Sequence, residues 1–320
     1  MTVAGKNKRL RAGNGLSQGQ NVEQSNRARQ KNREQASLNV DPRTVADFGR
    51  EWAAFDQHDL PLIEQKRLFE EYFSEFPWTD LPAKSEGFDL GCGSGRWAEL
   101  VAPKVGRLHC IDPAAEALDV CRRRLADVKN ADFHLATADN IPVADCSQDF
   151  GYSLGVLHHI PDTARAMRDA ARKLKPGAPF LVYLYYDFEN RPTWFRAVWR
   201  VSDLGRALIA RLPFVAKKAI TGIIAATVYW PLSRSAKWLE KAGINVSNIP
   251  LSAYRHRAFY SLRTDALDRF GTRLEHRFSS TAIRRMMEDA GLERITFRQG
   301  EPYWCACGRR VHAGGSSATA

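Results

Sequence analysis

The sequence predicts an α/β fold built on a doubly wound parallel sheet. Strand and helix patterns alternate between residues 86 and 187, which is typical of a parallel sheet with helices on both faces. A short apolar strand ending at Leu90 runs into three alternating glycines, a pattern that lets a ligand lie against bare backbone. An acidic residue, Asp112, closes the next predicted strand. Together these features predict a ligand site at the carboxyl ends of the strands.

The elements of this sheet follow one another closely. Apolar runs bounded by turn residues predict strands at 87–90, 107–111, 131–135, 150–153 and 179–186. Segments with helical spacing predict helices at 96–104, 113–129 and 163–174.

The spacing of the glycines distinguishes between cofactors. A dinucleotide-binding loop reads Gly-x-Gly-x-x-Gly, with the pyrophosphate at a helix N-terminus. Here the order is Asp89-x-Gly91-x-Gly93-x-Gly95. A carboxylate at Asp89 would repel a pyrophosphate but suits a ligand with a positively charged amino group, and Asp112 can accept hydrogen bonds from two ribose hydroxyls. The cationic nucleoside S-adenosylmethionine satisfies both ends.

Four elements in this order resemble the class I S-adenosylmethionine-dependent methyltransferases, most closely the subgroup of quinone and small-molecule methylases. They are 89–96, Asp112, 137–142 and 149–160, within a resemblance that covers residues 86–186. It implies a Rossmann-like sheet and S-adenosylmethionine as the cofactor, with no metal. The residues it assigns to the cofactor are Asp89, Gly91, Gly93, Gly95, Asp112, Thr137, Ala138 and Asp139. Thr137 stands where the family commonly has an aspartate, so the adenine contact falls either to Thr137 or to Asp139.

Two histidines, His158 and His159, follow the fourth strand, where the methyl acceptor of this family usually lies. A neutral imidazole can remove a proton from an acceptor at cellular pH, so both are candidate catalytic residues. The alternative is structural, with one histidine capping the next helix and the other packing. The segment before them reads Ser153-Leu154-Gly155-Val156 and contains neither the Asn/Asp-Pro-Pro-Tyr run nor the Pro-Cys pair typical of base methylases.

The resemblance also organises the rest of the chain. A final helix at 281–290 and a hairpin of 295–300 with 303–309 would complete the sheet. The predicted regions are a disordered basic tail at 1–40, a helical cap at 41–85, the cofactor-binding core at 86–187, a helical insertion or lid at 188–278, the last helix and hairpin at 279–312, and a disordered end at 313–320.

The insertion is unusually apolar for a connecting segment. Residues 194–240 contain four tryptophans and a run of isoleucines, so we expect a mostly helical lid that contacts a hydrophobic acceptor or a membrane surface. The interleaved basic residues, Lys217 and Lys218 among them, are expected to face solvent, acidic headgroups or an anionic acceptor. The alternative is a static helical subdomain. No apolar run is long enough to span a bilayer.

Charge and cysteine content set the expected partners and location. The net charge is +11, but residues 1–37 hold eight lysines and arginines against two glutamates, so more than half of the excess lies in the tail. Six scattered cysteines predict reduced thiols and a cytoplasmic protein, peripheral at a membrane if the insertion docks there. Nucleic acid is not an expected partner.

The expected activity is methyl transfer to oxygen or carbon of a small or amphipathic metabolite. Three alternatives stay open: an RNA methyltransferase that uses the basic tail, a non-catalytic S-adenosylmethionine-binding protein, and a nicotinamide oxidoreductase. The last would need the third glycine one residue later.

Overall fold

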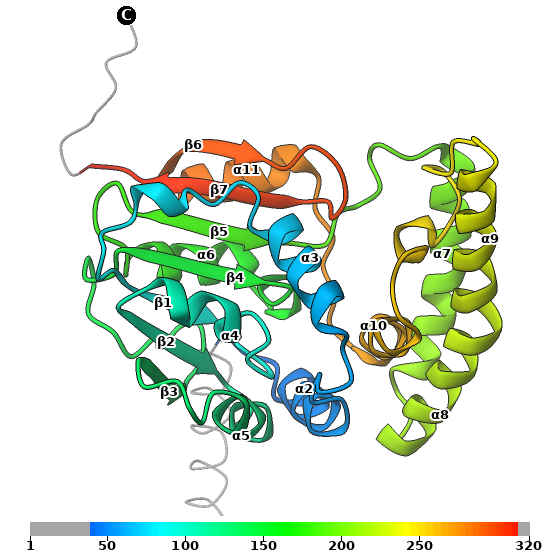
Figure 1. The fold of residues 1–320 in the computed structure, drawn as a ribbon, viewed down its shortest axis with the longest axis horizontal. Coiled ribbons are helices and arrows are strands. Elements are labelled where there is room, and N and C mark those ends of the chain that lie inside the picture. The colour runs from blue at the N-terminus through cyan, green and yellow to red at the C-terminus, as the bar shows by residue number, and fades with distance from the viewer. Residues whose placement is uncertain (1–38, 313–320) are drawn as a thin grey trace, which may run out of the picture. The chain divides into compact units, whose positions relative to one another are not determined.

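A seven-stranded sheet forms the centre of the protein. The computed structural model describes residues 39–312, so most of the two predicted disordered ends lies outside the described residues. The strands are β1 (Glu86–Leu90), β2 (Arg107–Asp112), β3 (Ala131–Leu135), β4 (Phe150–Leu154), β5 (Pro179–Tyr183), β6 (Leu292–Phe297) and β7 (Cys305–Arg310). Their order is β3-β2-β1-β4-β5-β7-β6 (Figure 1). Strands β1 to β5 are parallel, and β7 runs antiparallel to both β5 and β6.

Two glycine–phenylalanine pairs hold β1 against β4. A Cβ on Gly151 would lie 2.4 Å from the ring of Phe88, and one on Gly87 would lie 2.4 Å from the ring of Phe150. Each glycine therefore makes room for the ring on the neighbouring strand. The two rings lie on opposite faces of the sheet, because consecutive residues of a strand alternate. This packing fixes the strand that leads into the glycine loop.

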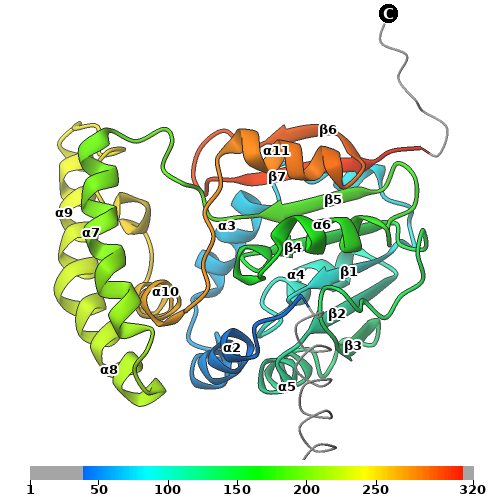
Figure 2. The same ribbon diagram turned by 180° about the vertical axis from the view of Figure 1, so that it is seen from behind.

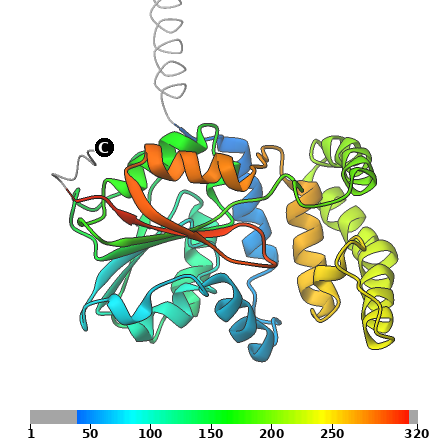
Figure 3. The same ribbon diagram turned by 90° about the horizontal axis from the view of Figure 1, so that it is seen from above.

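Helices cover both faces of the sheet, as expected for a doubly wound fold (Figures 2 and 3). One core contains Phe73, Trp97 and Tyr152 and is covered by α3 (Leu62–Tyr72), α4 (Ala98–Val101) and α5 (Ala115–Arg124). The other core contains Met167 and Met287 and is covered by α6 (Thr163–Ala171) and α11 (Ser280–Asp289). Both faces of the sheet are thus buried, so a ligand can reach the sheet at the ends of its strands.

Several elements differ from the bounds that the sequence predicts: the strand expected at 179–186 ends at Tyr183, and the helices expected at 113–129 and 163–174 span 115–124 and 163–171. The helix expected at 96–104 is α4 followed by a 3-10 turn, Ala102–Lys104, because Pro103 has no N–H to continue an α-helix. The strand expected at 295–300 begins earlier, at Leu292, because Gly291 adopts φ 77° and ends α11 directly before it.

The segment between β5 and α11 is largely helical. It contains α7 (Thr193–Ile209), α8 (Phe214–Ile224), a π-helical turn (Ala225–Tyr229), α9 (Trp230–Lys241), a 3-10 turn (Ser252–Tyr254) and α10 (Phe259–Gly271). These helices have a small core of their own, formed by Ala225, Tyr229, Leu262 and Ala266. In Figure 1 they stand beside the carboxyl ends of the parallel strands.

One lysine of the insertion corrects a prediction from the sequence. Lys217 does not face solvent: its side chain is 2% exposed and lies 2.8 Å from Asp47 on α2 (Pro42–Ala54). Its ammonium group also donates to the carbonyl of Gly271 at the end of α10. A buried ammonium needs such partners, so Lys217 joins the insertion to the N-terminal cap.

None of the helices within residues 39–312 combines the length and the apolar character needed to cross a membrane.

Candidate functional site

The glycine loop after β1 needs glycine at each of its three positions. Gly91, Gly93 and Gly95 have φ values of 83°, 52° and 77°, which L side chains rarely adopt. Space is also lacking: a Cβ on Gly91 would lie 2.4 Å from Val156, and one on Gly95 would lie 2.7 Å from the sulfur of Cys121. The loop therefore presents backbone where other residues would present side chains.

Asp112 at the end of β2 holds this loop in place. One carboxylate oxygen accepts from the backbone N–H of Gly93 at 2.9 Å, and the other accepts from that of Ala114 at 2.8 Å. Burial raises the pKa of Asp112 to about 6, although both N–H bonds act in the opposite direction. Each oxygen keeps a lone pair, so the carboxylate can still accept from a ligand.

Asp89, which the sequence assigns to the cofactor, is buried on β1 directly before the glycine loop. It lies beneath the loop with only 1% of its surface exposed, and one of its oxygens has no hydrogen-bond partner within the described chain. Burial raises the pKa of this carboxyl well above its ordinary range.

Helix α2 lies across the glycine loop. A Cβ on Gly93 would lie 3.0 Å from the indole nitrogen of Trp52, so the two are in close contact. Asn39, which the sequence places in the tail, is buried, and its backbone N–H donates to the carboxylate of Asp139. Its side-chain amide donates to the backbone carbonyl of Asp162 and accepts from the backbone N–H of the same residue. The chain from residue 39 to the end of α2 therefore covers the loop.

Hydrogen bonds within the protein already engage the segment 137–139, which the sequence predicts to frame an adenine. Thr137 donates its hydroxyl hydrogen to Asp139 at 2.5 Å, and the second carboxylate oxygen of Asp139 accepts from Asn39. Ala138 is 5% exposed. Both carboxylate oxygens of Asp139 thus have a partner within the protein.

A cavity of about 570 Å³ opens beside the loop. Leu154, Gly155 and Tyr183 line it from the strand ends, Trp52 from α2, and Arg96 directly after the last glycine of the loop. Helices α7 and α10 of the insertion form the opposite wall. The cavity is therefore shared between the loop region and the insertion.

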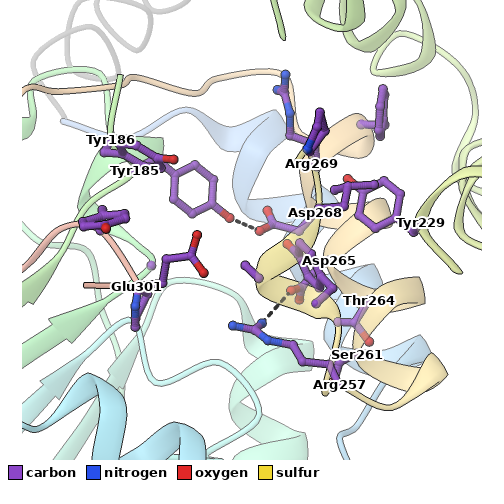
Figure 4. A pocket seen from close by; sticks show the side chains of 18 of the residues that line it. Tyr185, Tyr186, Tyr229, Arg257, Ser261, Thr264, Asp265, Asp268, Arg269 and Glu301 are labelled. Atoms are coloured by element: carbon purple, nitrogen blue, oxygen red, sulfur yellow. Dashed lines mark hydrogen bonds and ion pairs between the residues drawn. The ribbon is translucent and has the colours of Figure 1, made fainter. Parts of the chain in front are cut away.

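Polar groups from three distant segments meet in this cavity (Figure 4). Tyr185 donates its phenol hydrogen to Asp268 of α10. One turn earlier on the same helix, Asp265 pairs with Arg257 at 3.1 Å. Glu51 of α2 is 4% exposed and has one oxygen without a partner among the described residues. Burial, followed by the neighbouring Asp268 and Asp265, raises the pKa of Glu51.

A methyltransferase domain model matches residues 88–182, the part of the chain that holds the glycine loop, Asp112 and the strand before the two histidines. The chain therefore contains a methyltransferase domain of the class I S-adenosylmethionine-dependent type over these residues.

Individual relatives of this methyltransferase match only part of its length. An uncharacterized protein of transposon TN4556 from Streptomyces fradiae is 36% identical over 43% of the chain and 45% of that protein. A ubiquinone biosynthesis O-methyltransferase from Thiobacillus denitrificans is 32% identical over 48% of the chain and 65% of that enzyme. The chain thus spans between about half and two thirds of these relatives. A solved methyltransferase structure from Methanosarcina mazei is 16% identical over 73% of the chain and 95% of that protein, with a TM-score of 0.45.

The site of this methyltransferase fits the cofactor of its class. The three glycines form a cradle that side chains would fill, and Asp112 stands at its edge with accepting capacity left. These residues, with Thr137 and Ala138, would hold S-adenosylmethionine. We found no group of residues suited to a metal ion in residues 39–312.

The two candidate catalytic histidines lie on the 3-10 turn Leu157–His159 and do not line the cavity. His158 is fully buried and stacks on the ring of Tyr185 with centroids 3.9 Å apart. Burial lowers its pKa well below the ordinary value, so it is neutral. The Nδ1 of His159 lies 2.7 Å from the carbonyl of Leu274, and its Nε2 lies 3.8 Å from a carboxylate oxygen of Asp268.

Sequence reasoning missed the carboxylates of the cavity. Asp265 and Asp268 lie three residues apart on one face of α10, a spacing that identifies a shared face but not what it faces. Tyr254 and Arg257 of the insertion also line the cavity, whereas Arg255 and His256 pair with Glu240.

Proposed function

We propose that this protein transfers the methyl group of S-adenosylmethionine to a hydroxyl oxygen of a small or amphipathic acceptor bound in the cavity. The observation that carries the proposal is the position of Arg96. It follows the last glycine of the cofactor loop and also lines the cavity, so a ligand on the loop and an acceptor in the cavity would be neighbours. When bound, the cofactor supplies an electrophilic methyl group on a positively charged sulfur.

The acceptor must lose a proton as its oxygen gains the methyl group, and the cavity contains a base for it. Asp268 is partly exposed to the cavity and is oriented by the phenol of Tyr185. In this proposal Asp268 accepts the hydroxyl proton. Tyr185 keeps its own proton, because burial and the adjacent Asp268 raise its pKa well above 10.

His159 supports Asp268 from behind. Its Nδ1 faces a carbonyl oxygen, which can only accept, so Nδ1 carries the ring proton and the lone pair of Nε2 faces Asp268. His159 is thus a positioning residue that acts through Asp268, and His158 packs beneath Tyr185.

The remaining walls favour an acceptor that is apolar along part of its length. Rings of Tyr72, Tyr183, Phe188, Trp199 and Tyr229 line the cavity from the sheet edge and the insertion. Such walls exclude water from the reacting oxygen and bind an apolar chain or ring. The paired polar groups Arg257 and Asp265 offer one donor and one acceptor for a polar end. The helical insertion thereby covers the acceptor.

Incubation with methyl-labelled S-adenosylmethionine and a fractionated extract of cellular metabolites tests the proposal. We expect label in a small-molecule or lipid fraction, and none with Asp268→Asn. Asp119→Asn is the matched control, because Asp119 is exposed on α5 and, within residues 39–312, has its ion pair with its helix neighbour Arg122. Label in RNA, or tight S-adenosylhomocysteine binding without any labelled product, would replace the proposal by one of the alternatives.

A further inference from the structure

Helix α7 carries an apolar stripe that faces solvent. Val201, Leu204 and Leu208 are 69%, 70% and 67% exposed. Trp194 and Val198, earlier on the same helix, are 50% and 52% exposed. Their spacing of three and four residues puts all five on one side of the helix. A continuous apolar face of this kind on a folded protein marks an interaction surface.

The other side of α7 belongs to the acceptor cavity. Phe195, Trp199 and Ser202 line the cavity, and Val198 both lines it and is half exposed. The helix packs against α10, which carries Asp265 and Asp268 (Figure 2). Helix α7 is therefore a thin wall between the cavity and the apolar stripe.

The surroundings of the stripe are strongly basic. Residues 193–241 contain eight arginines and lysines besides the buried Lys217, but only two acidic residues, Asp203 and Glu240. Both acids are already paired, with Arg206 and Arg255 respectively. Arg200 and Arg211 are exposed and form no ion pair within the part of the chain that the structure describes.

We infer that this stripe docks α7 on the surface of an anionic phospholipid bilayer, with the helix lying in the plane of the interface. An amphipathic helix with an apolar stripe and basic flanks binds such a surface through both apolar burial and attraction to acidic headgroups. A second copy of the chain is a poorer occupant, because it would bring two basic surfaces together. The cavity wall would then rest on the bilayer, where an amphipathic acceptor can enter.

Vesicle flotation of the full chain tests this inference without any cofactor or acceptor. The vesicles are pure phosphatidylcholine or phosphatidylcholine mixed with phosphatidylglycerol. We expect the protein to float with the anionic vesicles and not with the neutral ones. Val201→Glu/Leu208→Glu should reduce the partition coefficient at least about tenfold, because it removes two apolar contacts and adds two negative charges.

The matched control is Leu62→Glu/Ile63→Glu. These residues are 58% and 86% exposed on α3, so the control removes similar apolar surface and adds the same charge elsewhere. It should float like the unchanged protein. The basic tail is present in every variant, so a difference between the two double variants reports on α7 alone. Circular dichroism and the melting temperature verify that both variants fold.

Three results would overturn the inference. The first is that the unchanged protein fails to float with anionic vesicles. The second is that the α7 variant floats as well as the control. In the third, the unchanged protein is a dimer by light scattering and the α7 variant a monomer, which makes the stripe an interface between copies. None of these results bears on methyl transfer, which is measured separately.

Discussion

The phenol of Tyr185, just past the end of β5, donates a hydrogen bond to Asp268, a residue 83 positions later on α10. This bond joins the methyltransferase sheet to the helical insertion inside the cavity (Figure 4). It orients one carboxylate oxygen of Asp268, while the other accepts from the hydroxyl of Thr272 at 3.4 Å and lies 3.8 Å from His159.

The first prediction concerns this pair. Asp268→Asn should lower kcat on the natural acceptor by about 10²-fold or more, the usual contribution of a positioned base. The affinity for S-adenosylhomocysteine, measured by calorimetry, should stay the same, because Asp268 is separate from the glycine loop. Tyr185→Phe should have a smaller effect, since it removes the orienting bond but keeps the carboxylate. A large loss of S-adenosylhomocysteine affinity in Asp268→Asn would show that the residue serves the cofactor instead.

The second prediction concerns pH and Asp112. Its pKa in the folded protein is about 6, above the ordinary value of 3.8, because burial disfavours the charge. Between these two values the folded state binds more protons at this site than the unfolded state does. The contribution of Asp112 to stability therefore falls as pH rises through that window.

The affinity for S-adenosylhomocysteine should change in the opposite direction, because only the ionised carboxylate has its full capacity to accept ribose hydroxyls. Calorimetric titrations at pH values on both sides of the pKa should show tighter binding above it. Asp112→Asn should bind more weakly, by roughly 1.5–3 kcal/mol, and lose this step in its pH profile. A step that persists in the variant would assign the titration to another group.

The third prediction concerns the contact between Gly93 and Trp52. Gly93→Ala places a Cβ 3.0 Å from the indole nitrogen and in a left-handed backbone conformation, so it should cost roughly 1–2 kcal/mol of stability and weaken cofactor binding. The matched control is Gly205→Ala on α7, where a Cβ would meet nothing within 4 Å. That change should stabilise the protein by about 0.5–1 kcal/mol. Equal melting temperatures for the two variants would contradict the close contact.

The fourth prediction concerns the buried ion pair between Lys217 and Asp47. Lys217→Met removes the shared donor of Asp47 and the Gly271 carbonyl, while Asp47 keeps Arg50 at 3.0 Å and Arg273 at 3.9 Å. The free energy of unfolding should therefore drop by roughly 1–3 kcal/mol, chiefly because the Gly271 carbonyl loses its donor. The double variant Lys217→Met/Asp47→Leu should recover part of this loss. Lys173→Met serves as the comparison: its pair with Asp145 has the same 2.8 Å separation, but Asp145 is 56% exposed. Chemical denaturation should show a loss of at most about 1 kcal/mol there.

The sequence by itself determined the fold class and the cofactor-binding loop. Both are encoded locally: the alternation of strand and helix patterns, the three glycines with positive φ, and an acid at the end of the next strand all lie within a short stretch of chain. The apolar character of the insertion could also be read directly, since composition needs no coordinates.

Only the tertiary structure decided which side chains share the cavity. Glu51, Tyr185 and Asp268 come from three segments separated by more than eighty residues, and no spacing along the chain relates them. The burial of individual side chains also depends on the tertiary structure. From the sequence Lys217 is one more surface lysine and His158 a candidate base. The packing shows that Lys217 is buried against Asp47 and that His158 stacks on the ring of Tyr185. Local sequence fixes backbone conformation over a few residues, whereas the environment of a charge depends on every segment that folds against it.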